Sequence, residues 1–279
     1  MKAKSIQLAI LSTTLTIAIL AQPSFAASVE TREIYSEAMK KNISATYVTP
    51  ESYGKGTEPY PVVYLLHGYS GDHGQWLEFS PLETLADRHD VIIACPDGGF
   101  SSWYFDSPED PTFRYETHVA AEVVAFTDTN YRTIKSRRGR AITGLSMGGH
   151  GAMLLALRHK DVFGAVGSTS GGVDIRPFPD NWDIKEKLGT IKEHPDRWEA
   201  LTVINNISLI KNNDLAIIID CGVDDFFIEV NRALHKKLLE AEINHDYIER
   251  PGEHNREYWH DSIKYQMLFF GEFFQRNQE

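Results

Sequence analysis

Residues 142–151 read ITGLSMGGHG, a decapeptide in which four glycines surround one serine, Ser146. Glycine loses more backbone freedom on folding than any other residue, so this concentration of glycine needs a structural reason. Gly144, Ser146 and Gly148 form the pattern G-x-S-x-G, which is typical of a serine held exposed on a sharp turn between a strand and a helix. We therefore interpret Ser146 as a nucleophile on a turn that is too tight for side chains.

The sequence around this turn alternates short apolar runs with amphipathic stretches. The apolar runs are typical of strands buried on both faces of a parallel sheet, and they lie at 62–68, 91–99, 141–144, 162–172 and 215–222. The helical stretches space their apolar residues three and four apart, and they lie at 118–131, 153–160 and 229–242. Residues 31–39 and 41–50 look like an opening antiparallel pair. This order predicts an α/β fold, with a mostly parallel central sheet, helices on both faces and the site at the carboxyl ends of the strands.

Residues 1–26 have the layout of a cleaved secretory signal peptide. Lys2 and Lys4 precede an uncharged, mostly apolar stretch, and Ser-Phe-Ala ends at Ala26 before Ala27. Polar residues thin the apolar run, which argues against a retained membrane anchor. We expect an exported protein, periplasmic or extracellular, without stable membrane insertion.

The remaining residues, 27–279, suffice for one catalytic domain with a single core. The formal net charge of the whole chain is −11, which disfavours nucleic acid as a partner. One segment, 172–213, interrupts the alternation of strands and helices, because it is polar and rich in turn-forming residues. It is either an ordinary surface connection or a small, irregular lid over the site.

A serine hydroxyl needs a base that accepts its proton, and we predict that this base is His254. His254 follows a strand-like stretch, 245–252, and precedes a helix-like stretch, 256–274, so it lies in a loop at the carboxyl end of a strand. His150 is the rival, but it lies one helical turn beyond Ser146 and is better placed to pack beside the turn. His159 and His235 lie on the polar sides of helices, so we expect both side chains to be exposed to solvent.

A catalytic triad also needs a third residue beside the serine and the histidine, an acid that orients the histidine. Asp220 lies within an apolar run, whereas Asp224 and Asp225 follow it in the next loop, and periodicity leaves both of these open. The backbone N–H groups of Tyr69 and Met147 are the predicted donors of an oxyanion hole, because one follows a glycine at a strand end and the other follows the nucleophile. We expect His67 to support this loop as a buried hydrogen-bonding residue.

Five ordered blocks resemble the putative-esterase family of α/β-hydrolases: LLHGYSGD, PDGGFSSWYFDSP, GLSMGGHGAMLLALRHKDVF, CGVDDFF and PGEHNREYW. The family includes esterase D, bacterial tributyrin and feruloyl esterases, acetylxylan esterases and mycolyltransferases. The resemblance covers nearly all of the chain from about residue 35.

The resemblance implies specific roles for residues of this chain. It selects Asp225 over Asp224 as the catalytic acid, and it supports Ser146, His254 and the amides of Tyr69 and Met147. The loop that contains Trp103 and Tyr104 resembles a loop near the family's site. These two residues, together with Trp182 in the irregular segment, are the candidates for substrate binding.

The family's sheet order also separates the strands of Cys95 and Cys221 by several others, on the order of 15–20 Å. A disulfide needs Cα atoms closer than about 7 Å, so both thiols should be free and buried.

These observations together predict an exported serine carboxylesterase that works through an acyl-enzyme. The expected substrate is a small-molecule or carbohydrate-linked ester, such as an acetyl or feruloyl ester of plant polysaccharide. Acyl transfer of the mycolyltransferase type and S-formylglutathione hydrolysis are the alternatives. The sequence holds no H-E-x-x-H pattern or other recognised ligand spacing, so we expect neither a metal nor an organic cofactor.

Overall fold

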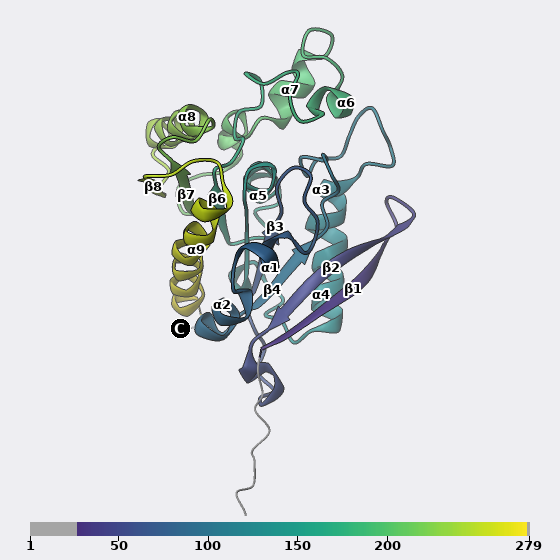
Figure 1. Cartoon of the computed structure of the whole chain (residues 1–279), viewed down its shortest axis with the longest axis vertical. Coiled ribbons are helices and arrows are strands. Elements are labelled where there is room, and N and C mark those ends of the chain that lie inside the picture. Colours follow the sequence, from purple (N-terminus) through teal and green to yellow (C-terminus); the bar gives the residue numbers. More distant parts are fainter. Residues whose placement is uncertain (1–26, 278–279) are drawn as a thin grey trace, which may run out of the picture.

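The computed structural model describes residues 27–277, which form a central sheet flanked by helices (Figure 1). The predicted signal peptide lies outside the described residues. Each apolar run found in the sequence becomes a strand of this sheet. The strands are β1 (Ser28–Ser36), β2 (Lys41–Thr49), β3 (Val62–Leu66), β4 (Ile92–Pro96), β5 (Arg140–Gly144), β6 (Ala165–Thr169), β7 (Ala216–Gly222) and β8 (Asp246–Arg250).

The strands follow the order β1-β2-β4-β3-β5-β6-β7-β8 across the sheet. β1 pairs with β2 and β2 pairs with β4 in antiparallel fashion, whereas all pairs from β4 to β8 are parallel. The predicted opening antiparallel pair and the predicted parallel sheet are therefore both confirmed. Since β3, β5 and β6 separate the strands of Cys95 and Cys221, both thiols are free and buried, as expected.

Helices cover both faces of the sheet, and side chains alternate between the two faces along each strand. In β3, Val62, Tyr64 and Leu66 point into one core, and Val63 and Leu65 point into the other. The helices are α1 (Gln75–Phe79), α2 (Leu82–His89), α3 (Tyr115–Thr117), α4 (Val124–Asn130), α5 (Met147–Arg158), α6 (Ile184–Leu188), α7 (Pro195–Leu201), α8 (Ile228–Glu240) and α9 (Arg256–Arg276). Of these, α4, α5 and α8 pack in the first core, and α1, α2 and α9 pack in the second.

The helix expected at 118–131 differs in detail from the prediction. A π-helical segment, His118–Val123, joins α3 to α4, so the stretch is continuous but not one regular α-helix. Such a π segment adds a residue to a turn and is invisible to apolar spacing.

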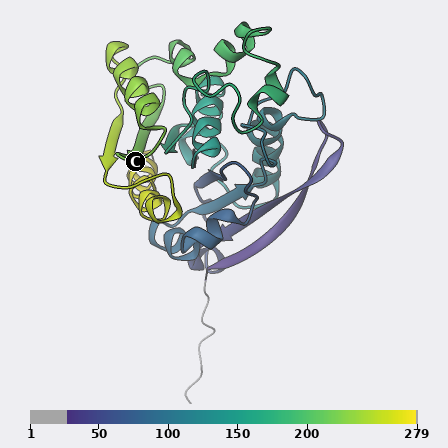
Figure 2. The ribbon, with the colours of Figure 1, turned by 45° about the horizontal axis from the view of Figure 1, so that its top comes forward.

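The segment 172–213 lies at the end of the sheet where β6 finishes, and it carries α6 and α7 (Figures 1 and 2). Four short helical turns replace the irregular structure expected there: α6, α7 and the 3₁₀ turns Val203–Asn205 and Ile207–Leu209. Along residues 27–277, none of the helices combines the length and apolar character that crossing a membrane requires.

Candidate active site

Ser146 lies at the turn between β5 and α5, as the glycine pattern predicts. Its φ is 55° and its ψ is −115°, a strained conformation for a residue with a side chain. Gly144 and Gly148 allow the turn, because a Cβ atom at either position would lie within 2.7 Å of the backbone oxygen of Leu66. α5 can therefore begin directly against the end of β3, and the half-buried Ser146 remains accessible.

His254 contacts the serine from the loop between β8 and α9. Its Nε2 atom lies 3.0 Å from the Oγ atom of Ser146, although the two residues are 108 positions apart. Its Nδ1 atom lies 2.9 Å from an oxygen of Asp225. A carboxylate can only accept, so Nδ1 carries the proton and Nε2 is free to accept from the serine hydroxyl. The Asn255 side chain caps α9 by accepting from the Tyr258 N–H, which fixes the loop just after His254.

Asp225, and not Asp224, is the carboxylate that faces the histidine. Asp225 is buried and also accepts a 2.8 Å hydrogen bond from the Phe227 N–H, whereas Asp224 is exposed. The third aspartate, Asp220, lies inside β7. It accepts hydrogen bonds from Thr169, Ser262 and Gln266, and burial raises the pKa of its carboxyl group.

The backbone next to Ser146 offers two N–H groups without a partner. Over residues 27–277, the N–H groups of Tyr69 and Met147 donate no hydrogen bond. Met147 is the first residue of α5, where N–H groups have no partner within the helix. Tyr69 follows Gly68, and a Cβ atom on Gly68 would lie 3.6 Å from the Ser146 Cβ. The two amides are thus on backbone segments that meet at the serine.

Gln75 holds the loop that carries Tyr69. Its side-chain oxygen accepts a 2.9 Å hydrogen bond from the Gly68 N–H, so the residue just before Tyr69 is fixed. The sequence analysis missed Gln75, because a polar residue seven positions after the glycine carries no recognisable signal.

His67 and His150 are both buried structural residues. His67 Nε2 accepts from the Gly98 N–H at 2.7 Å, so its Nδ1–H donates to the Gly68 carbonyl. His150 lies between the carbonyl oxygens of Trp103 and Leu201. His150 therefore packs beside the turn and does not reach the serine.

The structure corrects the expectation for Trp103 and Tyr104. They are 1% and 0% exposed, so their side chains lie in the core and cannot form a substrate-binding surface. Tyr104 donates to the His67 carbonyl and packs tightly against Gly98 and Gly151. Both residues therefore belong to the core. The sequence did not show this, because a loop motif does not reveal which way its aromatic rings point.

Trp182 does lie at the edge of the site. It is half-buried, and it stacks on the ring of Phe226 with ring centroids 5.7 Å apart. The Phe226 ring in turn lies 4.2 Å from the His254 ring and is 53% exposed. Phe226 is a second residue that the sequence analysis passed over, although it stands next to Asp225 in the block CGVDDFF.

The segment 172–213 contacts the loops of the site. The Tyr69 hydroxyl donates to Asp183 at 3.2 Å, and the Trp103 Nε1 donates to the carbonyl of Trp182.

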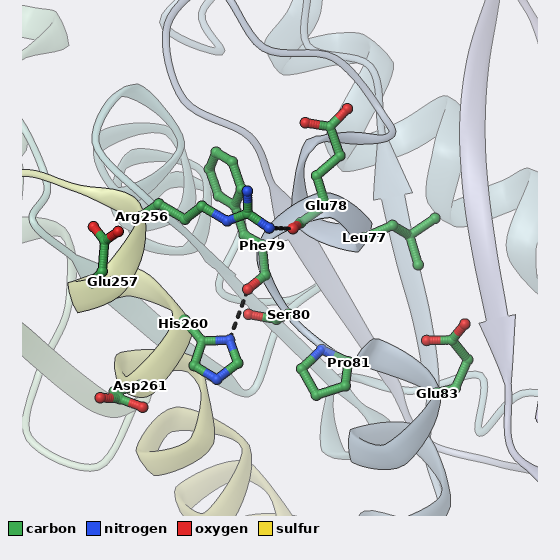
Figure 3. A pocket seen from close by; sticks show the side chains of 10 residues that line it. All are labelled: Leu77, Glu78, Phe79, Ser80, Pro81, Glu83, Arg256, Glu257, His260 and Asp261. Carbon is green, nitrogen blue, oxygen red and sulfur yellow. Dashed lines mark hydrogen bonds between the residues drawn. The ribbon is translucent and has the colours of Figure 1, made fainter.

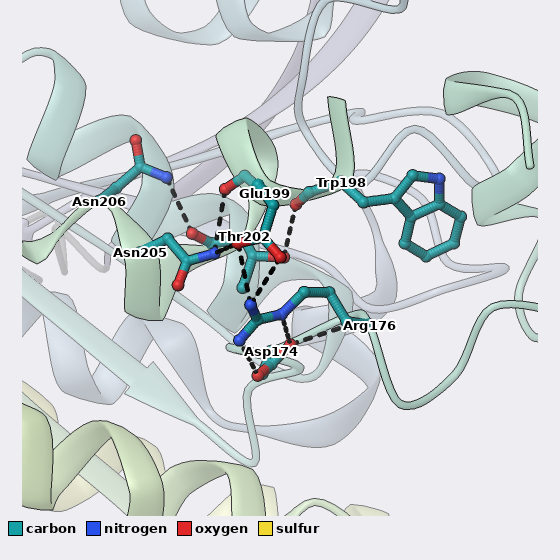
Figure 4. Close-up of polar contacts among 7 residues, drawn as sticks. All are labelled: Asp174, Arg176, Trp198, Glu199, Thr202, Asn205 and Asn206. Carbon is teal, nitrogen blue, oxygen red and sulfur yellow. Dashed lines mark hydrogen bonds and ion pairs between the residues drawn. The ribbon is translucent and has the colours of Figure 1, made fainter. Parts of the chain in front are cut away.

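Polar contacts within segment 172–213 also hold it together, as Figure 4 shows. Arg176 joins Asp174 to Glu199 through paired hydrogen bonds. The segment is therefore an ordered wall beside the site.

A separate cavity lies between α1 and the start of α9 (Figure 3). The Trp259 ring contacts both His254, with ring centroids 5.0 Å apart, and Phe79 of the cavity wall, with ring centroids 5.9 Å apart. Over the described range 27–277, no group of three or more His, Cys, Asp and Glu side chains is arranged to hold a metal ion.

Comparison with known proteins agrees with this fold. The family model described as "Putative esterase" matches residues 36–270. An acetyl esterase of Caldicellulosiruptor saccharolyticus is 26% identical over 254 residues, which cover 82% of this chain and 92% of that protein. An esterase of Mycobacterium tuberculosis is 27% identical over 250 residues, and the match covers 78% of this chain and 54% of that protein. This chain therefore spans about half the length of the mycobacterial relative.

A solved structure titled ferulic acid esterase superposes with a TM-score of 0.77 at 28% identity, and the match covers 90% of this chain and 100% of that one. The resemblance seen in the sequence blocks is thus confirmed over most of the chain. The protein belongs to the putative-esterase family and is a carboxylic ester hydrolase with the α/β-hydrolase fold.

Proposed function

We propose that the protein is an exported serine esterase in which Ser146, His254 and Asp225 form the catalytic triad. The observation that carries this proposal is the continuous hydrogen-bonded chain through the imidazole, 3.0 Å to Ser146 and 2.9 Å to Asp225. Such a chain activates a serine hydroxyl, which is a weak nucleophile alone.

In the first half-reaction, His254 Nε2 takes the hydroxyl proton while Ser146 Oγ attacks the ester carbonyl carbon. The N–H groups of Tyr69 and Met147 donate to the oxyanion that forms. His254 then gives its proton to the departing alcohol as the ester C–O bond breaks, which leaves the acyl group on Ser146. Water attacks the acyl-enzyme by the same steps and releases the acid.

We place the substrate among acetyl or feruloyl esters of plant polysaccharides. Relatives named acetyl esterase and ferulic acid esterase support this assignment. The exposed Phe226 ring and the neighbouring Trp182 offer an apolar surface beside the serine, on which an acyl group can pack. Segment 172–213 acts as the lid-like wall of this surface within a single catalytic domain, 27–279, and the signal peptide 1–26 directs export.

The test is covalent labelling together with hydrolysis. The wild-type protein should react with a fluorophosphonate probe at Ser146 and hydrolyse p-nitrophenyl acetate, methyl ferulate and acetylated xylan. Ser146→Ala should abolish labelling and lower kcat by about six orders of magnitude at an unchanged melting temperature. Labelling of another residue, or an active Ser146→Ala protein, would refute the triad. Product ratios with added alcohols should show hydrolysis over transfer.

A further inference from the structure

The cavity between α1 and α9 has a volume of about 570 Å³ and is open to solvent. Its two walls are continuous with the two loops of the active site. α1 begins at Gln75, which holds the loop of Tyr69, and α9 begins two residues after His254. An Arg256 guanidinium N–H donates to the Glu78 carbonyl and ties the walls together (Figure 3).

Ser80 forms part of the cavity wall. It is 5% exposed, and its hydroxyl oxygen is shielded from solvent and has no hydrogen-bond partner within residues 27–277. A ligand in the cavity therefore packs against the Ser80 side chain without reaching this oxygen.

His260 adds an acceptor beside Ser80. Its Nδ1–H donates to the Phe79 carbonyl at 2.7 Å, which leaves Nε2 unprotonated in the neutral ring. Among the described residues, this Nε2 atom has no protein partner. Figure 3 shows the His260 ring and the Ser80 side chain next to each other in the cavity.

The charged groups around the cavity are mixed in sign. Carboxylates of Glu83, Glu257 and Asp261 line it together with the guanidinium of Arg256. The carboxylates disfavour the binding of an anionic ligand. The positive charge of Arg256 disfavours the binding of a simple cation next to it. Hydroxyl groups both donate and accept, so a neutral polyhydroxylated ligand can pair with the carboxylates, the guanidinium and His260 together.

The cavity also lies near the histidine that protonates the alcohol in the proposed reaction, since α9 lines the cavity and begins two residues after His254. In the proposed reaction His254 protonates the departing alcohol, so the alcohol part of the substrate must lie next to His254. The Trp259 ring contacts both His254 and Phe79, which is part of the cavity wall. A chain of sugar residues that extends from the scissile ester over Trp259 would reach the cavity.

We propose that the cavity formed by Ser80, Glu83, Arg256, Glu257, His260 and Asp261 is a carbohydrate subsite. It binds a neutral sugar of the alcohol part of the ester. This inference rests on the proposed esterase function, which it extends from the acyl group to the alcohol.

Two variants remove polar atoms from the cavity without disturbing its walls. His260→Asn keeps an N–H for the Phe79 carbonyl but removes Nε2, and Glu257→Gln removes a charge at an exposed position. Glu272→Gln, on the same helix and outside the cavity, is the matched control. Each cavity variant should raise KM for acetylated xylo-oligosaccharides by about three- to tenfold at a nearly constant kcat.

Hydrolysis of p-nitrophenyl acetate, whose alcohol is too small to reach the cavity, should stay unchanged in all three variants. Equal losses on both substrates, or unchanged KM on the oligosaccharides, would overturn the subsite. A wild-type protein that hydrolyses neither substrate would instead refute the proposed function.

A binding measurement tests the subsite independently of catalysis. Unesterified xylohexaose should bind the wild-type and Ser146→Ala proteins equally in calorimetric titration, and about three- to tenfold more weakly to His260→Asn and Glu257→Gln. Tighter binding of a cationic chitosan hexamer, or xylohexaose affinity that ignores these substitutions, would rule the neutral-sugar assignment out.

Discussion

The ring of Phe226 lies against the imidazole ring of His254, with ring centroids 4.2 Å apart and ring planes 36° apart. Phe226 directly follows Asp225, so one loop supplies both the carboxylate at Nδ1 and an aromatic ring beside the imidazole. In the proposed reaction His254 becomes positively charged when Ser146 attacks. Because an aromatic face attracts a cation, the Phe226 ring stabilises that state.

Replacing Phe226 should therefore lower the rate of the chemical step. We expect Phe226→Leu to reduce kcat on p-nitrophenyl acetate by about three- to tenfold, and Phe226→Tyr to stay near the wild type. Phe226 is 53% exposed, so the melting temperature of both variants should change little. A fully active leucine variant, or a tyrosine variant as slow as leucine, would contradict this role.

Two adjacent aspartates should differ sharply in their importance. Asp225→Asn should lower kcat by about four orders of magnitude, because an amide no longer holds the tautomer of His254 that accepts the serine proton. Asp224→Asn should leave kcat within about twofold, since Asp224 is exposed and does not contact the histidine. Steady-state kinetics on p-nitrophenyl acetate will decide the assignment, and the reverse pattern would move the acid to Asp224.

Gln75 should act on catalysis through the oxyanion loop. Gln75→Leu removes the acceptor of the Gly68 N–H, and we expect kcat to fall about tenfold with little change in KM, less than the loss of an oxyanion donor costs. Gln75→Glu keeps a side-chain oxygen at this position and should recover most of the activity. If Gln75→Leu raised KM at constant kcat, the loop would serve substrate binding instead.

The sequence was sufficient to predict the sheet and the turn that carries Ser146, for identifiable reasons. Buried parallel strands need nearly continuous apolar runs, and the turn at Ser146 needs glycine where α5 meets β3. These requirements leave a local pattern that can be read without coordinates. The choice of Asp225 over Asp224 needed the family resemblance, because both follow the same strand.

The parts that escaped prediction depend on contacts between distant segments. Tyr104 turns inward because His67, Gly98 and Gly151 lie against it, and the Trp103 ring packs against His150. His235 was expected to face solvent, but it hydrogen-bonds His245 at 2.7 Å and stacks on Tyr247. The spacing of residues along one helix does not reveal which strand packs beside that helix.

Acid should destabilise the fold through His150. This histidine is fully buried next to the nucleophile turn, and burial lowers its pKa to about 4 from an ordinary value of 6.5. The unfolded chain therefore binds a proton more tightly than the native state between these two values, so stability is full above pH 6.5 and is lost as the pH falls towards 4. The shift corresponds to about 3 kcal/mol at most.

Urea unfolding at several pH values from 7 to 4 will measure this loss. His150→Gln, which can still donate to the Leu201 carbonyl but does not titrate, should lose less stability than the wild type over that range. His194→Gln removes a half-buried histidine elsewhere and should keep the wild-type slope. Because carboxylates and other groups titrate alike in all three proteins, the difference in slope isolates His150. Equal slopes for His150→Gln and the wild type would show that this buried imidazole does not set the acid limit of the fold.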